Sequence, residues 1–477
     1  MRLQQREAPV LSRRWWVLAV VCMAMFMGVL DSTSVYAALP VIAGDLGFAP
    51  AQVQWVITAY GVAVGGLLLL GGRLADYGGR HRVFMAAVGL FAAASLACGL
   101  ATSSEVLIAA RLLQGVGAAV MTPAGLSLLT HVFAEGPERN KALGIWGGLG
   151  GTGASAGLLF GGVLTDWAGW AWIFLTNIPV CLAVLALCPA LLPKVPRNRQ
   201  RLDLPGALTA TGALVLMLLA LFRIAGEGFD ARVMTYGVGA MLLTAAFVAV
   251  ELRSPAPLVP MRIFGSRVLV GGNATILIAG IAVDGLLIVV TLYAQMVLGF
   301  SALQFGLAMA IMTITSVAGV VGGARLVTRL GGRLVATTGL ALLVTACLVL
   351  SRLSVAGSFV QDLLAGLVIF GAGMGAAFVA GQIAALSGVA ERDAGLAAGL
   401  EETSFAVGTT MGAALASAVA IGYASDATPT PPVAESLTGG FSLALLVLAG
   451  IATLGAVLAV VLLAPSRLKE TDRAGHR

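Results

Sequence analysis

Five ionisable residues interrupt long apolar runs of this 477-residue sequence: Asp31, Arg111, Asp284, Glu401 and Glu402. Each ionised group inside a bilayer costs about 2.5–3.5 kcal/mol on insertion scales, so such groups usually mark a solute pathway or a proton relay. Aspartate and glutamate can take up and release a proton, whereas arginine keeps its charge. We therefore predict that these five residues take part in proton coupling and transport.

Asp31 and Arg111 are expected to form an ion pair. Asp31 lies about eight residues, or ~12 Å, before the end of its apolar run, and Arg111 lies about five residues, or ~8 Å, after the start of another. Two charges at similar depth would face each other, because either one alone in lipid is costly. A solute that disturbs the pair would favour protonation of Asp31. A purely structural ion pair is the alternative.

The sequence says less about the surroundings of the other three acidic residues. Asp284 follows Asp31 by 253 residues, which places it at a matching depth if the chain contains a repeat. Glu401 and Glu402 are adjacent, so their side chains point about 100° apart on a helix. At most one of them is expected to face a central cavity squarely. The alternative is that both extend to the membrane surface.

Several sequence features argue against an enzyme or a metalloprotein. Residues 153–157 (GASAG) and 148–153 (GLGGTG) match a hydrolase and a dinucleotide pattern, but both lie inside one apolar run, without the strand that these motifs require. There are only three histidines, and the five cysteines lack C-x-x-C spacing. No P-loop is present. We expect no catalytic residues, no cofactor and no metal site.

The composition identifies a membrane protein, since 59% of the residues are apolar and 10% are charged, against roughly 25% charged residues in soluble domains. A helix needs about 20 apolar residues to cross a bilayer. Fourteen runs meet this requirement: 15–38, 54–72, 83–101, 106–129, 142–164, 173–192, 205–224, 233–252, 268–293, 305–326, 335–351, 363–389, 395–422 and 441–464.

The charge distribution predicts the orientation of these spans. If both termini are cytoplasmic, all 28 lysines and arginines except Arg111, Arg223, Arg232 and Arg352 lie on the cytoplasmic side. This bias satisfies the positive-inside rule. The formal charge of +6 is therefore read as orientation in a membrane and not as nucleic-acid binding. Arginine strongly outnumbers lysine, which is typical of GC-rich bacteria, so a bacterial cytoplasmic membrane is expected.

An internal repeat divides the chain. Residues 73–79 (RLADYGG) are echoed by 325–331 (RLVTRLG), and residues 138–140 (ERN) by 391–393 (ERD). The interval leaves two spans without counterparts. We predict an all-α fold with two pseudo-symmetric six-helix bundles, residues 1–193 and 263–477, separated by a two-helix insert with flanking loops at residues 194–262.

Two further motifs point to a known family. The loop after the second run contains Gly72, Asp76, Gly79 and Arg80, and the fifth run carries spaced glycines. These glycines are Gly144, Gly153, Gly157, Gly161 and Gly162. Together with residues 30–40, 111–117 and 170–179, they resemble the major facilitator superfamily, in particular its fourteen-helix drug:proton antiporters.

The resemblance implies roles for these residues. Asp76 would contact the start of the thirteenth span, near Gly395, and so latch the two bundles, although a solvated charged loop is the alternative. Arg111 would serve proton transfer. The glycines match the antiporter motif, except that Leu158 stands where the family has proline. Generic glycine packing is the alternative for this face.

The implied activity is export of lipophilic or amphiphilic drugs in exchange for protons, by alternating access. The partners are then a small organic substrate, protons and the lipid bilayer, and a monomer is expected. Three alternatives stay open: export of one dedicated metabolite or self-made antibiotic, symport on the same fold, and a membrane sensor that transports nothing. The substrate itself cannot be derived from the sequence.

Overall fold

The computed structural model describes residues 8–49, 52–133, 137–192, 203–227, 229–255, 257, 259, 261–387, 389, 394–426 and 433–463. Within these ranges, eleven helices are long and apolar enough to cross a membrane, and three shorter apolar stretches lie in α2, α5 and α8. All fourteen runs expected from the sequence are therefore helical. The fold is an all-α, polytopic membrane architecture.

The helices follow one another in three groups. The first group contains α1 (Ala8–Asp45), α2 (Trp55–Gly78), α3 (Arg80–Gly99), α4 (Ser104–Val132), α5 (Pro137–Ala168), α6 (Ala171–Leu175) and α7 (Asn177–Leu191). The insert contains α8 (Leu204–Glu227) and α9 (Ala231–Arg253), followed by the short η1 (Met261–Gly265). The last group contains α10 (Arg267–Leu292), η2 (Tyr293–Val297), α11 (Ala302–Leu330), α12 (Gly332–Leu350), η3 (Phe359–Leu364), α13 (Ala365–Leu386), α14 (Ala394–Asp426) and α15 (Val433–Leu462).

The two halves share a turn that only glycine adopts easily. Gly79, between α2 and α3, has a φ of 92°, and Gly331, between α11 and α12, has a φ of 86°. Residues with a Cβ rarely adopt positive φ values. The repeated sequence around these glycines therefore forms the same tight turn in both halves.

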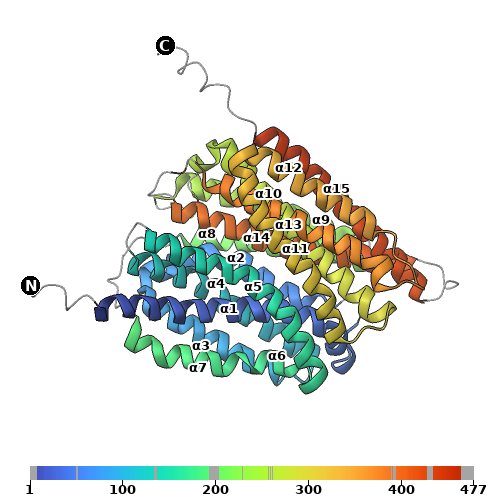
Figure 1. The fold of residues 1–477 in the computed structure, drawn as a ribbon, viewed down its shortest axis with the longest axis horizontal. Coiled ribbons are helices and arrows are strands. Elements are labelled where there is room, and N and C mark those ends of the chain that lie inside the picture. The colour runs from blue at the N-terminus through green and yellow to red at the C-terminus, as the bar shows by residue number, and fades with distance from the viewer. Residues whose placement is uncertain are drawn as a thin grey trace, which may run out of the picture.

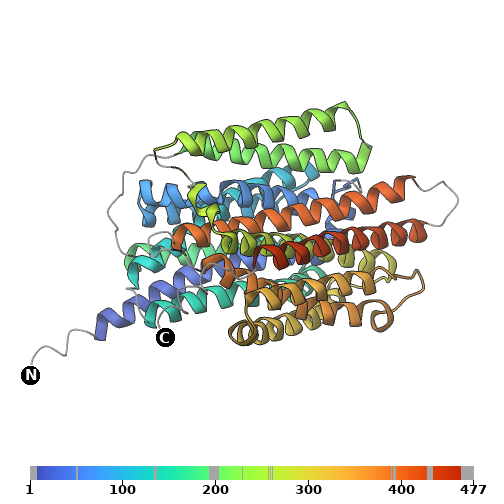
Figure 2. The ribbon, with the colours of Figure 1, turned by 90° about the horizontal axis from the view of Figure 1, so that it is seen from above.

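The halves form two bundles that pack side by side (Figure 1). The insert lies on one side of the molecule, with α8 inward and α9 outermost (Figure 2). Of its two helices, α8 contacts both α2 and α14, one from each bundle. The predicted boundary after residue 193 falls outside the described residues, and the predicted boundary after residue 262 falls within η1. The domain limits therefore stay a prediction.

The bundles meet closely at one end of the molecule. We call the end at which α1 begins and α15 ends the terminal end, and the opposite end the distal end. Near the distal end, Gln295 donates a hydrogen bond to the carbonyl oxygen of Ala37 at 2.9 Å, and the backbone N–H of Leu303 donates to Asp166 at 3.2 Å. Both bonds join one bundle to the other.

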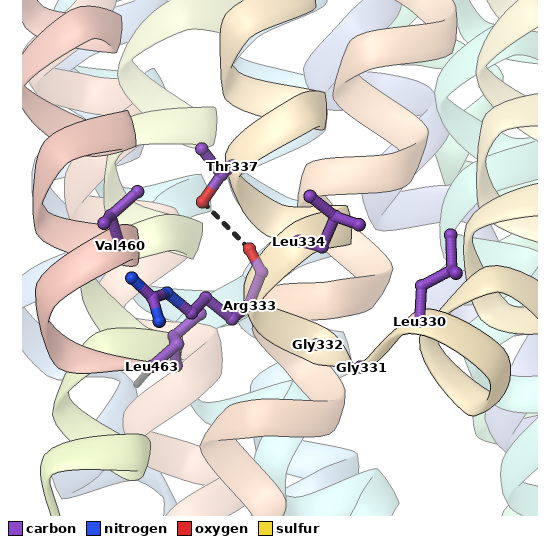
Figure 3. Close-up of a pocket in the computed structure, with 8 residues that line it drawn as sticks. All are labelled: Leu330, Gly331, Gly332, Arg333, Leu334, Thr337, Val460 and Leu463. Atoms are coloured by element: carbon purple, nitrogen blue, oxygen red, sulfur yellow. Dashed lines mark hydrogen bonds between the residues drawn. The ribbon is translucent and has the colours of Figure 1, made fainter. Parts of the chain in front are cut away.

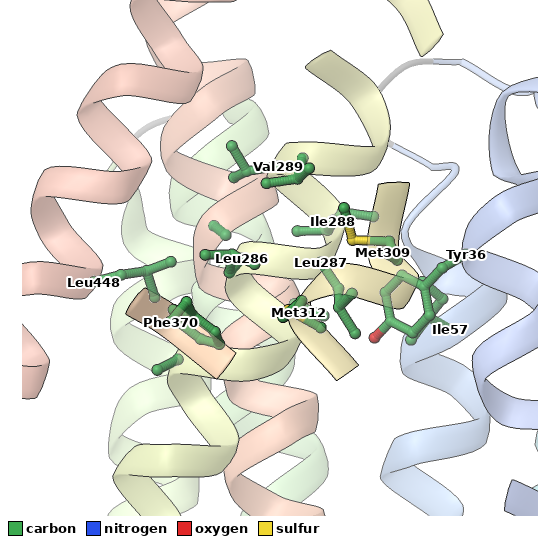
Figure 4. Close-up of a cluster of buried hydrophobic side chains, with 14 of the residues drawn as sticks. Tyr36, Ile57, Leu286, Leu287, Ile288, Val289, Met309, Met312, Phe370 and Leu448 are labelled. Carbon is green, nitrogen blue, oxygen red and sulfur yellow. The ribbon is translucent and has the colours of Figure 1, made fainter. Parts of the chain in front are cut away.

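Apolar side chains reinforce this distal contact. Tyr36 and Ile57 of the first bundle belong to one buried cluster with Leu287, Met309 and Met312 of the second (Figure 4). A second cluster, which includes Val21, Phe84 and Phe133, contains only residues of the first bundle. In this conformation the extensive apolar packing between the bundles is therefore distal.

Candidate functional site

The first bundle encloses a polar network centred on Asp31 of α1 and Arg111 of α4. Both residues are fully buried, and Nη1 of Arg111 lies 2.7 Å from Oδ2 of Asp31. The ion pair that we expected from their similar depth is therefore present. Burying such a pair is tolerated only when the remaining donors and acceptors are also satisfied.

Two neighbouring side chains bond to the pair, and a third supports them. Gln114, one turn after Arg111 on α4, donates to Oδ1 of Asp31 at 3.0 Å and accepts from Arg111 at 2.6 Å. Asn177 of α7 donates to the same Oδ1 at 2.6 Å. Ser95 of α3 accepts a hydrogen bond from Gln114 at 2.8 Å. The Asp31 carboxylate thus receives hydrogen bonds from three side chains on two helices.

The rest of the guanidinium is also engaged. Nε of Arg111 donates to the carbonyl oxygen of Val56 in α2 at 2.8 Å. Its Cζ lies 4.3 Å from the ring centroid of Tyr60 and 5.7 Å from that of Phe174. Arginine stacks on aromatic faces and donates within one plane, which a lysine cannot reproduce. The network therefore ties α1, α2, α3, α4 and α7 together around one ion pair.

This geometry lets one event at Asp31 affect most of the bundle. A proton on Asp31 would remove the negative charge opposite Arg111, and at least one of the three donors would have to move. Because those donors belong to different helices, protonation is coupled to side-chain positions across the bundle. An arrangement of this kind can link proton binding to a change of conformation.

Our sequence interpretation missed Gln114, Asn177 and Ser95. They are uncharged, so their cost in a membrane is smaller and their pattern less conspicuous than that of Asp31 or Arg111. One signal was available for Gln114, because a polar residue three positions after a buried arginine shares its helix face. The participation of α3 and α7 depends on tertiary packing.

Asp284 of α10 has a different environment from Asp31, despite the repeat. It lies on the side of the first bundle, next to Tyr36 of α1, whose buried hydroxyl forms no hydrogen bond among the described residues. The repeat interval places Leu364 where the first bundle has Arg111. The second bundle therefore offers Asp284 no equivalent arginine. The two acids match in sequence position, but within the described part of the chain only Asp31 has a paired cation.

The adjacent glutamates of α14 point in different directions. Glu401 is buried, with 5% of its surface exposed, and lies beside Gln382 of α13. Glu402 is exposed. This difference agrees with the 100° separation expected for neighbours on a helix. Their transport roles stay predictions.

We expect Glu402→Gln to impair export more than Glu401→Gln, because of the two side chains only that of Glu402 is exposed. Transport by the two variants should be compared at equal amounts of protein in the membrane. Equal and negligible effects would contradict a role for either residue and would favour a surface location for both carboxylates.

The glycine face of α5 packs against α1. A Cβ built on Gly153 would lie 3.2 Å from Val29, one on Gly157 would lie 2.6 Å from the carbonyl oxygen of Leu30, and one on Gly161 would lie 2.4 Å from that of Ser34. The neighbouring Gly162 faces the other bundle, where its Cβ would lie 2.5 Å from the carbonyl oxygen of Ala302. Gly144 lies outside the part of the chain for which such surroundings are described.

The predicted latch is described only in part. Gly79 forms the turn before α3, and Nη1 of Arg80 donates to the carbonyl oxygen of Ser127 at 3.2 Å, within the first bundle. Gly72 packs 3.7 Å from Pro123, measured from its built Cβ. The side chain of Asp76 and those at the start of α14 lie outside the described residues. The contact between the bundles therefore stays a prediction.

Comparison with known proteins agrees with this architecture. The sequence profile of the Major Facilitator Superfamily matches residues 21–413 and 277–477. The solved structure of an auto-inhibited peptide transporter of the POT family aligns over 94% of this chain and 97% of its own, with a TM-score of 0.66 and 16% identity. That likeness concerns the fold.

Curated relatives share much more sequence. The puromycin resistance protein of Streptomyces alboniger is 37% identical over 480 residues, which cover 97% of this chain and 94% of that protein. The cephamycin export protein of Amycolatopsis lactamdurans is 44% identical over 295 residues, or 61% of each chain. The chain therefore belongs to the Major Facilitator Superfamily, and within it to the fourteen-helix efflux transporters related to drug and antibiotic resistance proteins.

Proposed function

We propose that this transporter exports lipophilic or amphiphilic compounds in exchange for protons, by alternating access. The observation that carries the proposal is the buried Asp31–Arg111 pair, to which Gln114 and Asn177 are hydrogen-bonded. It provides a carboxylate that can bind one proton inside the membrane, held by helices that must move together when the charge changes.

The contacts between the bundles support alternating access. The hydrogen bonds from Gln295 to Ala37 and from Leu303 to Asp166 are distal, as is the apolar cluster around Tyr36. Opening towards the distal side would break these contacts. The conformation described here is then the distally closed one, in which solute and protons approach from the terminal end.

Transport into everted membrane vesicles tests the proposal. Vesicles whose interior is acidified should accumulate a fluorescent amphiphile, because protons leaving the lumen would drive solute in. An uncoupler, which dissipates the proton gradient, should abolish this accumulation. Uptake that persists at full rate without a proton gradient would contradict proton exchange.

A dedicated exporter of one antibiotic is the second candidate. The names of the two curated relatives each specify a single antibiotic, puromycin or cephamycin. Expression in a pump-deficient bacterium, challenged with a panel of compounds, separates the two functions. Resistance to several unrelated compounds supports a broad exporter, whereas resistance to one supports a dedicated one.

We further propose a location in the bacterial cytoplasmic membrane with the terminal end facing the cytoplasm, and a monomeric transporter. The excess of arginines at the loops of this end supports the orientation. A reporter fused after Arg199 should then be active in the cytoplasm. External activity at that position would reverse the orientation.

A further inference from the structure

A groove of about 630 Å³ opens at the terminal end, between the start of α12 and the end of α15. Its walls are the apolar side chains of Leu330, Leu334, Val460 and Leu463, and Arg333 extends across it from α12 towards α15 (Figure 3). Leu330 and Leu334 are 55% and 49% exposed. The groove therefore combines one cation with an apolar surface that no part of the described chain covers.

The described helices around this groove carry positive charge. Arg333 is exposed, and among the residues that the structure describes it forms neither a hydrogen bond through its guanidinium nor an ion pair. Arg325 and Arg329, in the last two turns of α11, are exposed as well. Neither α11 nor α12 contains an acidic residue. Within the described residues, α11 and α12 thus present positive charge here without an acidic side chain of their own.

The position of the groove along α12 corresponds to the surface of a membrane. Helix α12 has 19 residues, or about 28 Å at 1.5 Å per residue, which is close to the ~30 Å hydrocarbon core of a bilayer. Arg333 is its second residue, and Arg352 follows its other end. Since α12 and α15 lie at the outer edge of their bundle (Figure 1), a bilayer whose hydrocarbon core spans α12 would place the groove at headgroup level.

We propose that this groove binds an anionic phospholipid of the phosphatidylglycerol type. The headgroup phosphate would accept hydrogen bonds from Arg333, and an acyl chain would lie along Leu334 and Val460. Basic pockets between membrane helices on the cytoplasmic side favour anionic headgroups. A free phosphate would leave the apolar walls in water, so the combination of walls and charge selects a lipid.

The tail of the chain is a less suitable occupant. Residues 464–477 follow Leu463 directly and contain four basic and two acidic residues, Arg467, Lys469, Glu470, Asp472, Arg473 and Arg477. This net positive segment would be repelled by Arg325, Arg329 and Arg333. The same charge would add to the attraction of an anionic lipid.

Lipid retention by the purified full-length protein tests the assignment. Arg333→Gln and the matched control Arg352→Gln remove one charge from opposite ends of α12, and both residues are exposed, so folding should be unaffected. Native mass spectrometry after titration with phosphatidylglycerol should show about fivefold weaker retention for Arg333→Gln and no change for Arg352→Gln. Phosphatidylcholine should be retained weakly by all three proteins.

Two results would overturn the proposal. One is equal retention of phosphatidylglycerol by Arg333→Gln and Arg352→Gln. The other is retention that appears only after residues 464–477 are deleted, which would assign the groove to the tail. Val460→Trp, which fills the apolar wall and keeps Arg333, should also lower retention. Normal elution of each variant in gel filtration would exclude misfolding as the cause.

Discussion

Asp31→Asn should abolish proton-coupled export while leaving folded protein in the membrane. Asparagine keeps the size of the side chain and can still bond to Gln114 and Asn177, but it has no charge for Arg111 and cannot exchange a proton. Leaving one member of a buried ion pair without its partner costs about 3–5 kcal/mol. The rate of uptake into everted vesicles, measured as a function of external pH, should fall to background and should no longer depend on pH.

Variants of Arg111 separate charge from geometry. Arg111→Lys keeps the charge but cannot bond at once to Asp31, Gln114 and Val56 or stack on Tyr60, so export should fall strongly. The double variant Asp31→Asn with Arg111→Gln removes both charges and should recover stability without recovering coupling. Export of normal rate and pH dependence in Asp31→Asn would refute this role and direct attention to Asp284.

Gly162→Ala should shift the transporter away from the distally closed conformation. Its new Cβ would lie 2.5 Å from the carbonyl oxygen of Ala302 and 2.9 Å from Cα of Leu303, both in the other bundle. Backbone atoms cannot move aside cheaply, and overpacking costs about 1–3 kcal/mol. A penalty of this size in one conformation alone changes the equilibrium about 5- to 150-fold.

The adjacent Gly161 provides a matched comparison. Its Cβ would meet Ser34 of α1, inside the same bundle, so Gly161→Ala should lower thermal stability in both conformations and leave their ratio nearly unchanged. Gly450→Ala, where nothing lies within 4 Å, is the neutral control. Spin labels on Gln52→Cys and Ser354→Cys, in distal turns of the two bundles, report the opening. An unchanged distance distribution in Gly162→Ala would contradict the prediction.

The sequence predicted the helices well because lipid imposes a strict length and polarity on each of them. Helix α10 covers Arg267–Leu292, where the apolar run suggested 268–293. Helix α1 extends to Asp45, beyond the predicted residue 38, because Pro40 lies inside it without ending it. The sixth run is divided at Thr176 into α6 and α7, a division that we did not predict.

The ion pair was also predictable, since the depth of a charge follows from its position in a span. The roles of Asn177 and Ser95 were not, because Asn177 bonds to both Asp31 and Ser95 only through the packing of three helices. The repeat suggested matching depths for Asp31 and Asp284. Their different surroundings arise because Arg111 has no counterpart at Leu364, and a repeat preserves the backbone more strictly than the side chains.

Helix α8 makes the two lipid-facing edges of the interface between the bundles different from each other. At one edge, Thr211 of α8 donates to the carbonyl oxygen of Gly66 in α2 at 2.7 Å. Leu214 of α8 packs with Val62 of α2 and with Ala414 of α14. At the other edge α5 meets α11, and no further described helix covers them. A hydrophobic molecule dissolved in the bilayer therefore meets α8 at one edge of the interface between the bundles and meets α5 and α11 directly at the other. Entry from the lipid into this interface is then expected only at the edge formed by α5 and α11.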